Sequence, residues 1–273
     1  MSLKGLIKSL LTKRTIIKIS LNTVSPSERF LGKKVLVTGG SSGIGLEITK
    51  EFLAEGAEVM ITGRNKGRLE EAIQKLKNTK LKTIEWDVAD ISSLDNKFME
   101  VLSEMGQVDI FINNAGIYEA SVWNQIKESE YDKVNDVNCK GLFFMCQHEA
   151  EYFFKNCIRG RIININSVAG IKSGFDAYSV SKWGSVCITR SLAAKMAPYG
   201  IVINGIAPGN VVTNIHDGVR EKDVMDNAFM PLHKTQRYTL VEEIASMALY
   251  LSSDMASNII GQVIAIDGGW TLN

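Results

Sequence analysis

Short apolar runs alternate with longer stretches of helical periodicity from residue 33 to the end of the chain. Runs rich in Val and Ile predict seven strands, over residues 35–37, 59–61, 81–86, 108–112, 161–166, 201–206 and 263–266. Between most of them the periodicity predicts helices, including residues 44–52, 66–77, 130–156, 177–197 and 241–252. Because strands that alternate with helices form right-handed crossovers, the pattern predicts a doubly wound α/β fold. Such a parallel sheet, covered on both faces, binds its ligand at the carboxyl ends of the strands.

The first 30 residues carry a different pattern. Their apolar positions follow the stripe of an amphipathic helix, at Leu3, Leu6, Ile7, Leu10 and Leu11, and five cations precede the first acid, Glu28. A basic segment of this kind packs on its own domain or on a partner subunit, or it makes a peripheral membrane contact through residues 1–20. No linker rich in Pro, Gly or Ser divides the rest of the chain. We therefore expect an N-terminal extension over residues 1–30 and a single domain over residues 31–273.

Composition narrows the classes of function. The 31 basic and 30 acidic side chains leave a formal net charge of +1, which gives no signal for binding nucleic acid. The four Cys residues show neither zinc nor redox spacing, and they indicate reduced thiols in a cytoplasmic protein. The three His residues are scattered along the chain, so we expect no metal site.

A glycine-rich segment, Thr38-Gly-Gly-Ser-Ser-Gly-Ile-Gly45, joins the first predicted strand to the first predicted helix. Glycines at such a junction permit a tight turn and let backbone N–H groups approach a pyrophosphate. The positive end of the following helix also favours the negative charge of phosphate. The segment therefore predicts that a dinucleotide binds at the end of the first strand.

Tyr178 and Lys182 are four residues apart within a predicted helix, so they share one face of it. An ammonium near a phenol favours the ionised phenolate and brings its pKa toward the range that suits a general acid or base. Ser167 lies just upstream, after the fifth predicted strand. This group predicts proton transfer, although Tyr and Lys at this spacing also occur as ordinary surface pairs.

Further motifs follow in order along the chain. They are T-G-x-x-x-G-x-G at residues 38–45, Asn113-Asn-Ala-Gly116, Val-Asn138-Cys-Lys-Gly141, Ser167, Tyr178-x-x-x-Lys182, Pro208-Gly209 and Asp267-Gly-Gly269. From residue 33 to residue 273 the chain resembles the classical short-chain dehydrogenase/reductase family. The residues of its motifs are most similar to those of the 3-oxoacyl-[acyl-carrier-protein] reductase-like group.

The resemblance implies a single-domain Rossmann fold, with a seven-stranded parallel sheet and helices on both faces. It also implies an oxidoreductase that transfers hydride between a nicotinamide cofactor and a small-molecule carbonyl or secondary alcohol. Within the family, a sugar or polyol dehydrogenase is the alternative. A dinucleotide-binding regulator without catalysis is the alternative of another class. The resemblance further implies a homotetramer or a homodimer.

The choice of cofactor depends on the end of the second predicted strand. NAD enzymes usually place an acid there, which binds the ribose hydroxyls and repels a 2′-phosphate. This chain has Gly63 at that position, followed by Arg64. A guanidinium suits a phosphate, and the Ser42 hydroxyl could add a hydrogen bond. We expect NADP(H), with NAD(H) as the alternative if Arg64 is only a solvated surface side chain.

The resemblance assigns the remaining cofactor contacts, whereas Asn113 is expected only to tie strands together. These contacts are Gly39, Ser41, Ser42, Gly43, Ile44, Gly45, Asp87, Val88, Asn114, Ala115, Gly116, Tyr178, Lys182, Pro208, Gly209, Val211 and Thr213.

It also assigns four residues to one catalytic relay: Asn138, Ser167, Tyr178 and Lys182. Tyr178 is the expected general acid or base, and Ser167 is the expected hydrogen-bond donor to the substrate oxygen. Lys182 stabilises the phenolate and can bind the nicotinamide ribose, while Asn138 holds a water that connects Lys182 to solvent.

One spacing departs from the family pattern. The approach from Ser167 to Tyr178 spans eleven positions, fewer than in many members of the family. The shorter loop at the mouth of the site weakens the transfer of any one relative's substrate preference. Residues 214–237 fall where the family places a substrate lid. Candidate residues for the wall of the substrate pocket are Phe175, Ile215, His216, Phe229 and Met230.

Overall fold

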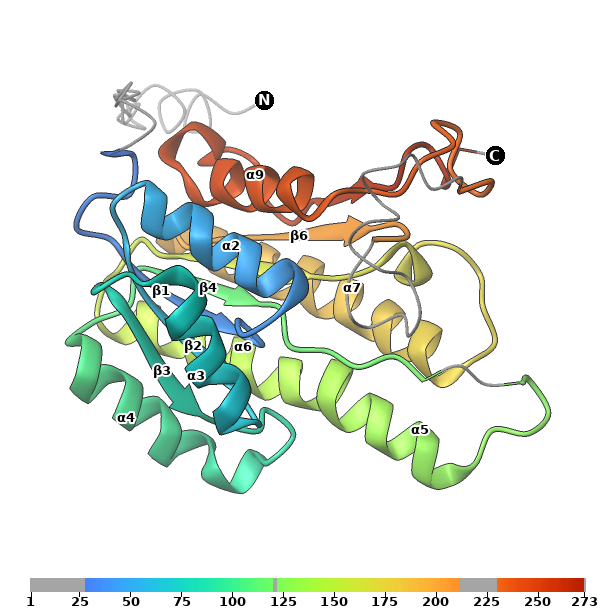
Figure 1. Ribbon diagram of the computed structural model, residues 1–273, viewed down its shortest axis with the longest axis horizontal. Coiled ribbons are helices and arrows are strands. Elements are labelled where there is room, and N and C mark those ends of the chain that lie inside the picture. Colours follow the sequence, from blue (N-terminus) through green and yellow to red (C-terminus); the bar gives the residue numbers. More distant parts are fainter. Residues whose placement is uncertain (1–27, 120–121, 212–229, 273) are drawn as a thin grey trace, which may run out of the picture.

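The computed structural model describes residues 28–119, 122–211 and 230–272, and its centre is one parallel sheet (Figure 1). The sheet has seven strands in the order β3-β2-β1-β4-β5-β6-β7. They are β1 (Lys34–Thr38), β2 (Glu58–Gly63), β3 (Leu81–Glu85), β4 (Ile110–Asn113), β5 (Arg161–Ile165), β6 (Val202–Pro208) and β7 (Val263–Ile266). All pairs are parallel; for example, Val37 of β1 lies opposite Ile61 of β2 and Ile112 of β4. The predicted α/β sheet is confirmed.

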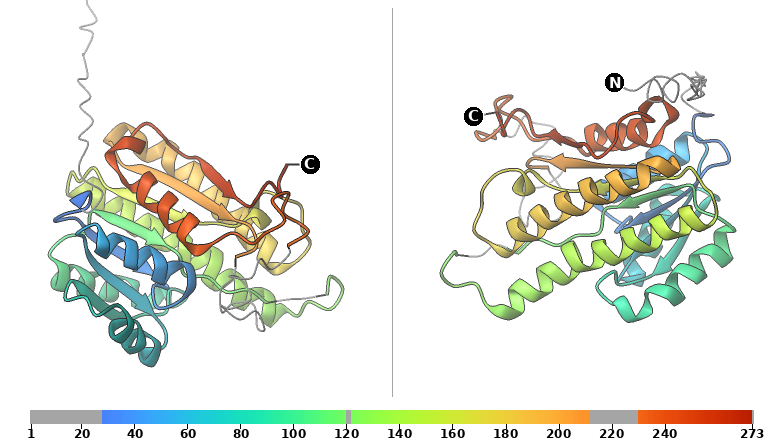
Figure 2. Two further views of the ribbon diagram at one scale, coloured as in Figure 1. Left: turned by 45° about the horizontal axis from the view of Figure 1, so that its top comes forward. Right: turned by 180° about the vertical axis from the view of Figure 1, so that it is seen from behind.

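Helices cover both faces of this sheet. They are α2 (Gly43–Ala54), α3 (Lys66–Leu76), α4 (Leu94–Met105), α5 (Glu128–Asn135), α6 (Leu142–Lys155), α7 (Ala177–Met196) and α9 (Val241–Ser252). One apolar core joins α2, α3 and α9 to the sheet, and a second joins α4, α6 and α7 to the opposite face. Figure 2 shows the second layer in its right-hand view. Successive residues of β1 alternate between the two cores, with Val35 and Val37 in one and Leu36 in the other, as a strand requires.

The predicted helix over residues 130–156 is one helical stretch in three parts. A π-helical segment, Asp136–Gly141, separates α5 from α6. Such a segment places an extra residue in a helical turn and often marks a functional position. Here it carries Asn138, which the structure buries. The sequence periodicity gave no sign of this interruption, because apolar positions continue on both sides of it.

The carboxyl ends of β1 and β4 are tied together where the strand order reverses. The Thr38 hydroxyl accepts hydrogen bonds from the backbone N–H groups of Asn114 and Ala115, at 3.1 Å each. This is the position at which a doubly wound sheet forms a ligand crevice.

Several predictions concern residues beyond those the structure describes. Most of the N-terminal extension, Thr213, and the wall candidates Ile215, His216 and Phe229 fall in this group. At the predicted domain boundary, Phe30 is buried against Phe52, with ring centroids 4.8 Å apart. Phe30 therefore belongs to the folded unit. Within the described ranges, none of the helices has the length and apolar character needed to cross a membrane.

Candidate active site

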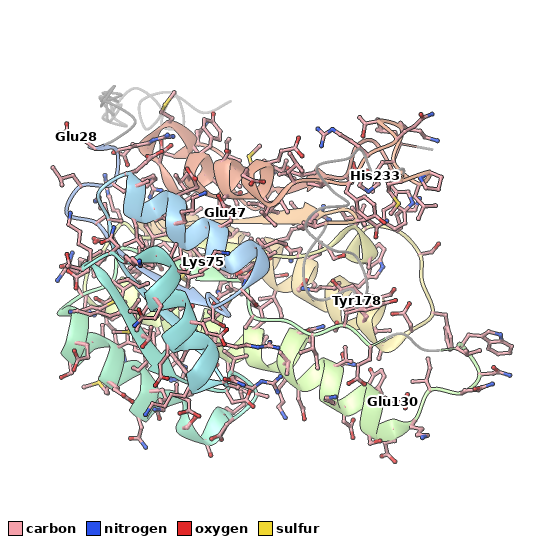
Figure 3. The ribbon with its side chains drawn as sticks, in the orientation of Figure 1. Glu28, Glu47, Lys75, Glu130, Tyr178 and His233 are labelled. Atoms are coloured by element: carbon pink, nitrogen blue, oxygen red, sulfur yellow. The ribbon has the colours of Figure 1, made fainter. Side chains whose placement is uncertain are left out.

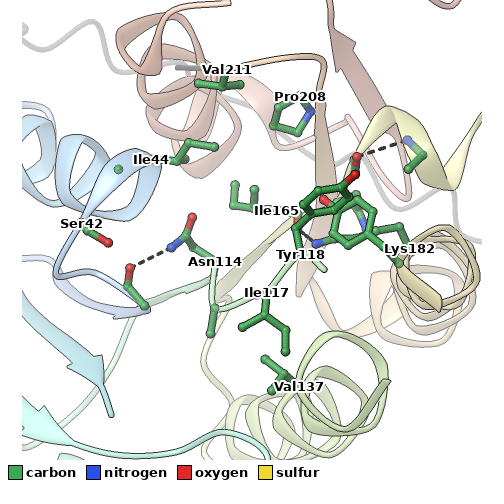
Figure 4. A pocket seen from close by; sticks show the side chains of 18 of the residues that line it. Ser42, Ile44, Asn114, Ile117, Tyr118, Val137, Ile165, Lys182, Pro208 and Val211 are labelled. Carbon is green, nitrogen blue, oxygen red and sulfur yellow. Dashed lines mark hydrogen bonds between the residues drawn. The ribbon is translucent and has the colours of Figure 1, made fainter. Parts of the chain in front are cut away.

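A cavity of about 1030 Å³ opens at the carboxyl ends of the strands. Figure 4 shows Ser42 and Ile44 at one end of it and Tyr118 and Lys182 at the other, with Asn114 between them. Of the predicted catalytic and cofactor-binding residues that the structure describes, all except Gly45 and Asn138 line this cavity. In Figure 3, Tyr178 and His233 lie on the side to which the strand arrows point.

The glycine segment forms the turn from β1 into α2. Gly39 and Gly43 have φ angles of +64° and +52°, which glycine adopts without strain. Ser42 is the N-cap of α2, yet its side chain makes no capping hydrogen bond, and the first turn of the helix carries no acid. The free N–H groups and positive end of this helix therefore suit an anion.

Gly45 serves packing behind the cavity wall. A Cβ at Gly45 would meet the backbone oxygen of Gly39 and Nδ2 of Asn114, each at 2.4 Å. That Nδ2 donates to the carbonyl oxygens of Thr38 and Gly39, at 3.1 and 3.0 Å. Gly45 thus packs α2 closely against the glycine turn, and its contact with the cofactor stays a prediction.

Arginine side chains mark the edge of the cavity beyond β2. Arg64 is half exposed, and its Nη1 lies 3.8 Å from Oδ2 of Asp87. Exposed pairs of this length are weak, so the guanidinium is available to a ligand. Arg68, on the first turn of α3, also lines the cavity. Sequence reasoning missed Arg68, although its place four residues after Arg64, in the first turn of a predicted helix, could have indicated it.

Thr62 and Trp86 are among the other lining residues that sequence reasoning missed. Both are almost fully buried, and Oγ1 of Thr62 and Nε1 of Trp86 have no hydrogen-bond partner among the described residues. Asp87 and Val88 follow Trp86, and Oδ1 of Asp87 accepts the N–H of Ala89 at 3.0 Å. Unpaired buried polar atoms beside a cavity are typical of places where a ligand or water completes the bonding.

Three of the four predicted catalytic residues meet at the other end. Ser167 follows β5, and its Oγ accepts the N–H of Ala169 at 3.1 Å. Ser167 also hydrogen-bonds with Tyr178, near the start of α7. Lys182 is one turn further on, with Nζ 5.6 Å from the centroid of the Tyr178 ring. Its Nζ donates to the carbonyl oxygen of Ile165 at 3.1 Å.

Asn138 lies behind the cavity wall. Its Oδ1 accepts the N–H of Ile117 at 2.9 Å, and its Nδ2 donates to the carbonyl of Ile117 at 2.8 Å and to Oγ of Ser181 at 3.2 Å. A Cβ at Gly116 would lie 3.3 Å from Oδ1 of Asn138 and 3.7 Å from Nζ of Lys182. Asn138 thus fixes the wall segment next to Lys182, with both amide protons already used.

Burial dominates the acid–base properties of the pair. It raises the pKa of Tyr178 above 10.0, and the hydrogen bond with Ser167 acts in the opposite direction. Burial also lowers the pKa of Lys182 from 10.5 to about 8. The expectation that Lys182 brings the pKa of Tyr178 down is therefore wrong for this structure, because desolvation penalises the phenolate and the ammonium alike.

Asn113 ties strands and helix together beneath the site, as its place in the sequence suggested. Its Nδ2 donates to Oδ1 of Asn164 at 3.0 Å and to Oε2 of Glu149 at 2.8 Å. Glu149 is fully buried, and burial raises the pKa of its carboxyl from 4.5 to about 8. The carboxyl is therefore neutral at pH 7.

The Pro208–Asn210 turn is held by a residue that sequence reasoning did not single out. Buried His233 accepts the N–H of Asn210 through Nε2 at 3.1 Å, and its ring lies 6.0 Å from that of Trp270. Pro208, Gly209 and Val211 line the cavity beside it. The nearby Asp267-Gly-Gly269 motif is a tight turn, since the Asp267 carboxylate accepts the N–H groups of Gly269 and Thr271.

The two described wall candidates are not in the wall. Phe175 is 76% exposed, and neither it nor Met230 lines the cavity. Met230 instead lies beside the Pro208–Asn210 turn, where its sulfur accepts from Nδ2 of Asn210 at 3.3 Å. Tyr118 takes the wall position: its ring meets that of Tyr178 edge-on, with centroids 5.1 Å apart.

Comparison with known proteins agrees with this geometry. The family model described as enoyl-(acyl carrier protein) reductase matches residues 39–271. The chain is 34% identical to the 3-oxoacyl-[acyl-carrier-protein] reductase of Thermotoga maritima over 247 residues, which cover 88% of this chain and 98% of the relative. The crystal structure of a short-chain type dehydrogenase/reductase from Mycobacterium marinum superposes with a TM-score of 0.81 at 27% identity, covering 89% of this chain and 97% of that one.

The chain belongs to the short-chain dehydrogenase/reductase family. It is an enzyme of the 3-oxoacyl-[acyl-carrier-protein] reductase-like group, whose members bind NAD(P). Sugar dehydrogenases are also among its relatives. Gluconate 5-dehydrogenase of Gluconobacter oxydans is 31% identical over 246 residues, which cover 89% of this chain and 96% of the relative.

Proposed function

We propose that this enzyme is an NADP(H)-dependent oxidoreductase that transfers hydride between the nicotinamide and a carbonyl or secondary alcohol. The observation that carries the proposal is the cavity itself. Its one end has a glycine turn, a helix N-terminus and two arginines, and its other end has Ser167, Tyr178 and Lys182. A single elongated ligand could contact both ends.

The lining residues fit an NADP cofactor. The uncapped N-terminus of α2 suits the pyrophosphate, and Thr62 and Trp86, each with a buried unpaired polar atom, also line the cavity. Asn114, Ala115, Gly116, Pro208, Gly209 and Val211 would form the remaining wall around the ribose and nicotinamide. Thr213 remains a proposed contact on the basis of the family motif.

The 2′-phosphate is the proposed ligand of Arg64 and Arg68, with Ser42 nearby in the turn. Gly63, at the end of β2, supplies no carboxylate to repel it. Two guanidinium groups can donate several charge-assisted hydrogen bonds to one phosphate. Comparing the Kd of NADPH with that of NADH tests this role, since the two values would be similar if the arginines only faced solvent.

The chemistry divides among four residues. When bound, the nicotinamide supplies or accepts the hydride. Tyr178 delivers a proton to the carbonyl oxygen in reduction and removes it in oxidation. Ser167, already bonded to Tyr178, donates to the same oxygen and stabilises the charge that develops there.

Lys182 and Asn138 support this step. Because the pKa of Lys182 is about 8, its ammonium is present at neutral pH beside Tyr178, where it would bind the nicotinamide ribose. Asn138 keeps the Ile117 segment in place next to Lys182. The remaining lone pair of its Oδ1 could hold the water that links Lys182 to solvent.

A 3-oxoacyl thioester is the first substrate class to test, since 3-oxoacyl-[acyl-carrier-protein] reductases are close in sequence. A sugar or polyol is the second, and the relationship to gluconate 5-dehydrogenase favours it. Loss of NADPH absorbance should be followed over a panel of 3-oxoacyl thioesters, keto sugars and keto acids. Oxidation of NADPH by at least one of them is expected, whereas cofactor binding without turnover across the panel would favour a non-catalytic regulator.

The proposed oligomeric state is a homotetramer or a homodimer, and the proposed compartment is the cytoplasm. All four cysteines are free in the structure, which supports a reducing compartment. Light scattering of the purified full-length chain would establish the number of subunits.

A further inference from the structure

Lys172 occupies the short loop between Ser167 and Tyr178 and lines the same cavity. Its backbone is held from two sides. The backbone N–H of Lys172 donates to the carbonyl oxygen of Val168 at 2.8 Å. The carbonyl oxygen of Lys172 accepts a hydrogen bond from Nε1 of Trp183 at 3.1 Å. The backbone of Lys172 is therefore fixed, although the loop around it is exposed.

The loop packs directly on the reacting end of the cavity. A Cβ at Gly170 would lie 2.4 Å from the carbonyl oxygen of Lys182, which shows how closely the two segments approach. Lys172 follows Gly170 by two positions. A second cation thus lies at the mouth of the site, apart from the buried Lys182.

The Lys172 ammonium is held by Trp270, which also lines the cavity. Nζ donates to the carbonyl oxygen of Trp270 at 3.2 Å and lies 5.6 Å from the centroid of the indole ring. Among residues 28–119, 122–211 and 230–272, no carboxylate forms an ion pair with it. An ammonium has three donors, so two remain for a ligand.

Asp176 is the acid on the same loop that also lines the cavity. Its two carboxylate oxygens accept the N–H and the hydroxyl of Ser179, at 2.7 and 2.8 Å, as the N-cap of α7. These bonds direct the Asp176 carboxylate to the helix rather than to Lys172. The Lys172 charge is consequently left for a ligand that enters the cavity.

We propose that Lys172, positioned by Trp270, binds a carboxylate of the substrate, so that the enzyme acts on keto acids or hydroxy acids. This inference rests on the proposed function, because it concerns the substrate of the same site. One ammonium balances the single charge of a carboxylate. A phosphate monoester carries a charge of roughly −1.5 to −2 near pH 7, which one cation leaves partly unbalanced.

The test compares matched substrates that differ only in charge, acetoacetate and methyl acetoacetate, with further keto acids and their methyl esters. The selectivity is the ratio of kcat/KM for the acid to that for its ester. Lys172→Met should lower this ratio by roughly tenfold or more, since a hydrogen bond to a charged group is lost. Lys172→Arg keeps the charge and should retain most of the ratio.

Two controls keep the outcome clear. Lys155→Met removes an exposed cation that pairs with Glu151 on α6, and it should leave the ratio unchanged. Lys172→Gln replaces Lys172→Met if the melting temperature shows that the latter does not fold. A ratio that stays the same in the neutral Lys172 variants would overturn the proposal.

Failure of the proposed function is distinguished by a binding measurement. If no carbonyl compound is turned over, acetoacetate is titrated calorimetrically into the protein in the presence of NADP⁺. Tighter binding to the wild type than to Lys172→Met would support the carboxylate site even without catalysis. Equal binding, or none, would overturn it.

Discussion

The two ends of the cavity are lined by different kinds of chemical group. At the glycine turn the cavity is lined by backbone at a helix N-terminus and by arginines that are partly exposed. At the other end its lining includes Tyr178 and Lys182, whose pKa values are shifted by burial. Binding can therefore be carried by one end and proton transfer by the other, so changes at each end should have separable effects.

The largest expected effect comes from Tyr178→Phe. Removing the proton donor should lower kcat by roughly 10²–10⁴-fold, the usual contribution of general acid–base catalysis. The Kd of NADPH, measured by fluorescence titration, should stay near that of the wild type. Tyr199→Phe is the matched control, since Tyr199 is exposed, meets the ring of Phe154 edge-on and does not line the cavity. Wild-type kcat in the Tyr178 variant would remove this residue from the mechanism.

Ser167→Ala should lower kcat by about 10²-fold, because one donor to the developing negative charge is lost. The change also removes the hydroxyl that accepts the N–H of Ala169, so a modest fall in melting temperature is expected. Steady-state kinetics separate the two effects. Ser252→Ala serves as control, since this buried hydroxyl has no partner among the described residues. An equal loss of activity in both variants would argue against a specific role for Ser167.

At the opposite end, Arg64→Ala or Arg68→Ala should raise the Kd of NADPH roughly tenfold and change that of NADH much less. The kcat at saturating NADPH should remain close to the wild-type value. Lys75→Ala removes a cation from the last turn of the same helix, α3, and should change neither Kd. If the Kd values of NADPH and NADH rise equally, the arginines do not bind the 2′-phosphate.

The smallest effect concerns the polar layer beneath the site. Glu149 ionises near pH 4.5 in the unfolded chain but near pH 8 when folded, so the folded state binds more protons between these values. The free energy of unfolding should therefore fall as pH rises through this range, by at most about 1.4 kcal/mol per pH unit from this group. Glu149→Gln should reduce that slope, measured by urea unfolding from pH 5 to pH 8. The control Glu151→Gln, exposed on the same helix, should leave it intact.

The sheet and the glycine turn could be predicted from sequence because both depend on local rules. Apolar runs separated by helical periods define the strands, and a positive φ at Gly39 and Gly43 requires glycine whatever the surroundings. The nearness of Ser167, Tyr178 and Lys182 was also foreseen, from the order of motifs along the chain.

What the sequence could not predict depends on three-dimensional burial. The pKa of Tyr178 rises because the surrounding chain excludes water, and no spacing reveals that. Asn138, in the π-helical segment, bonds to the backbone of Ile117, which is 21 residues away in the sequence. The role of His233 could be recognised only in the folded structure, where it accepts a hydrogen bond from Asn210.

A crystal structure of the enzyme with NADPH would test the central claim, that one cofactor joins the two ends of the cavity. We predict the 2′-phosphate between Arg64 and Arg68, the pyrophosphate at the N-terminus of α2 and the nicotinamide beside Tyr178. A phosphate bound away from both arginines, or a nicotinamide out of reach of the Tyr178 hydroxyl, would contradict the account.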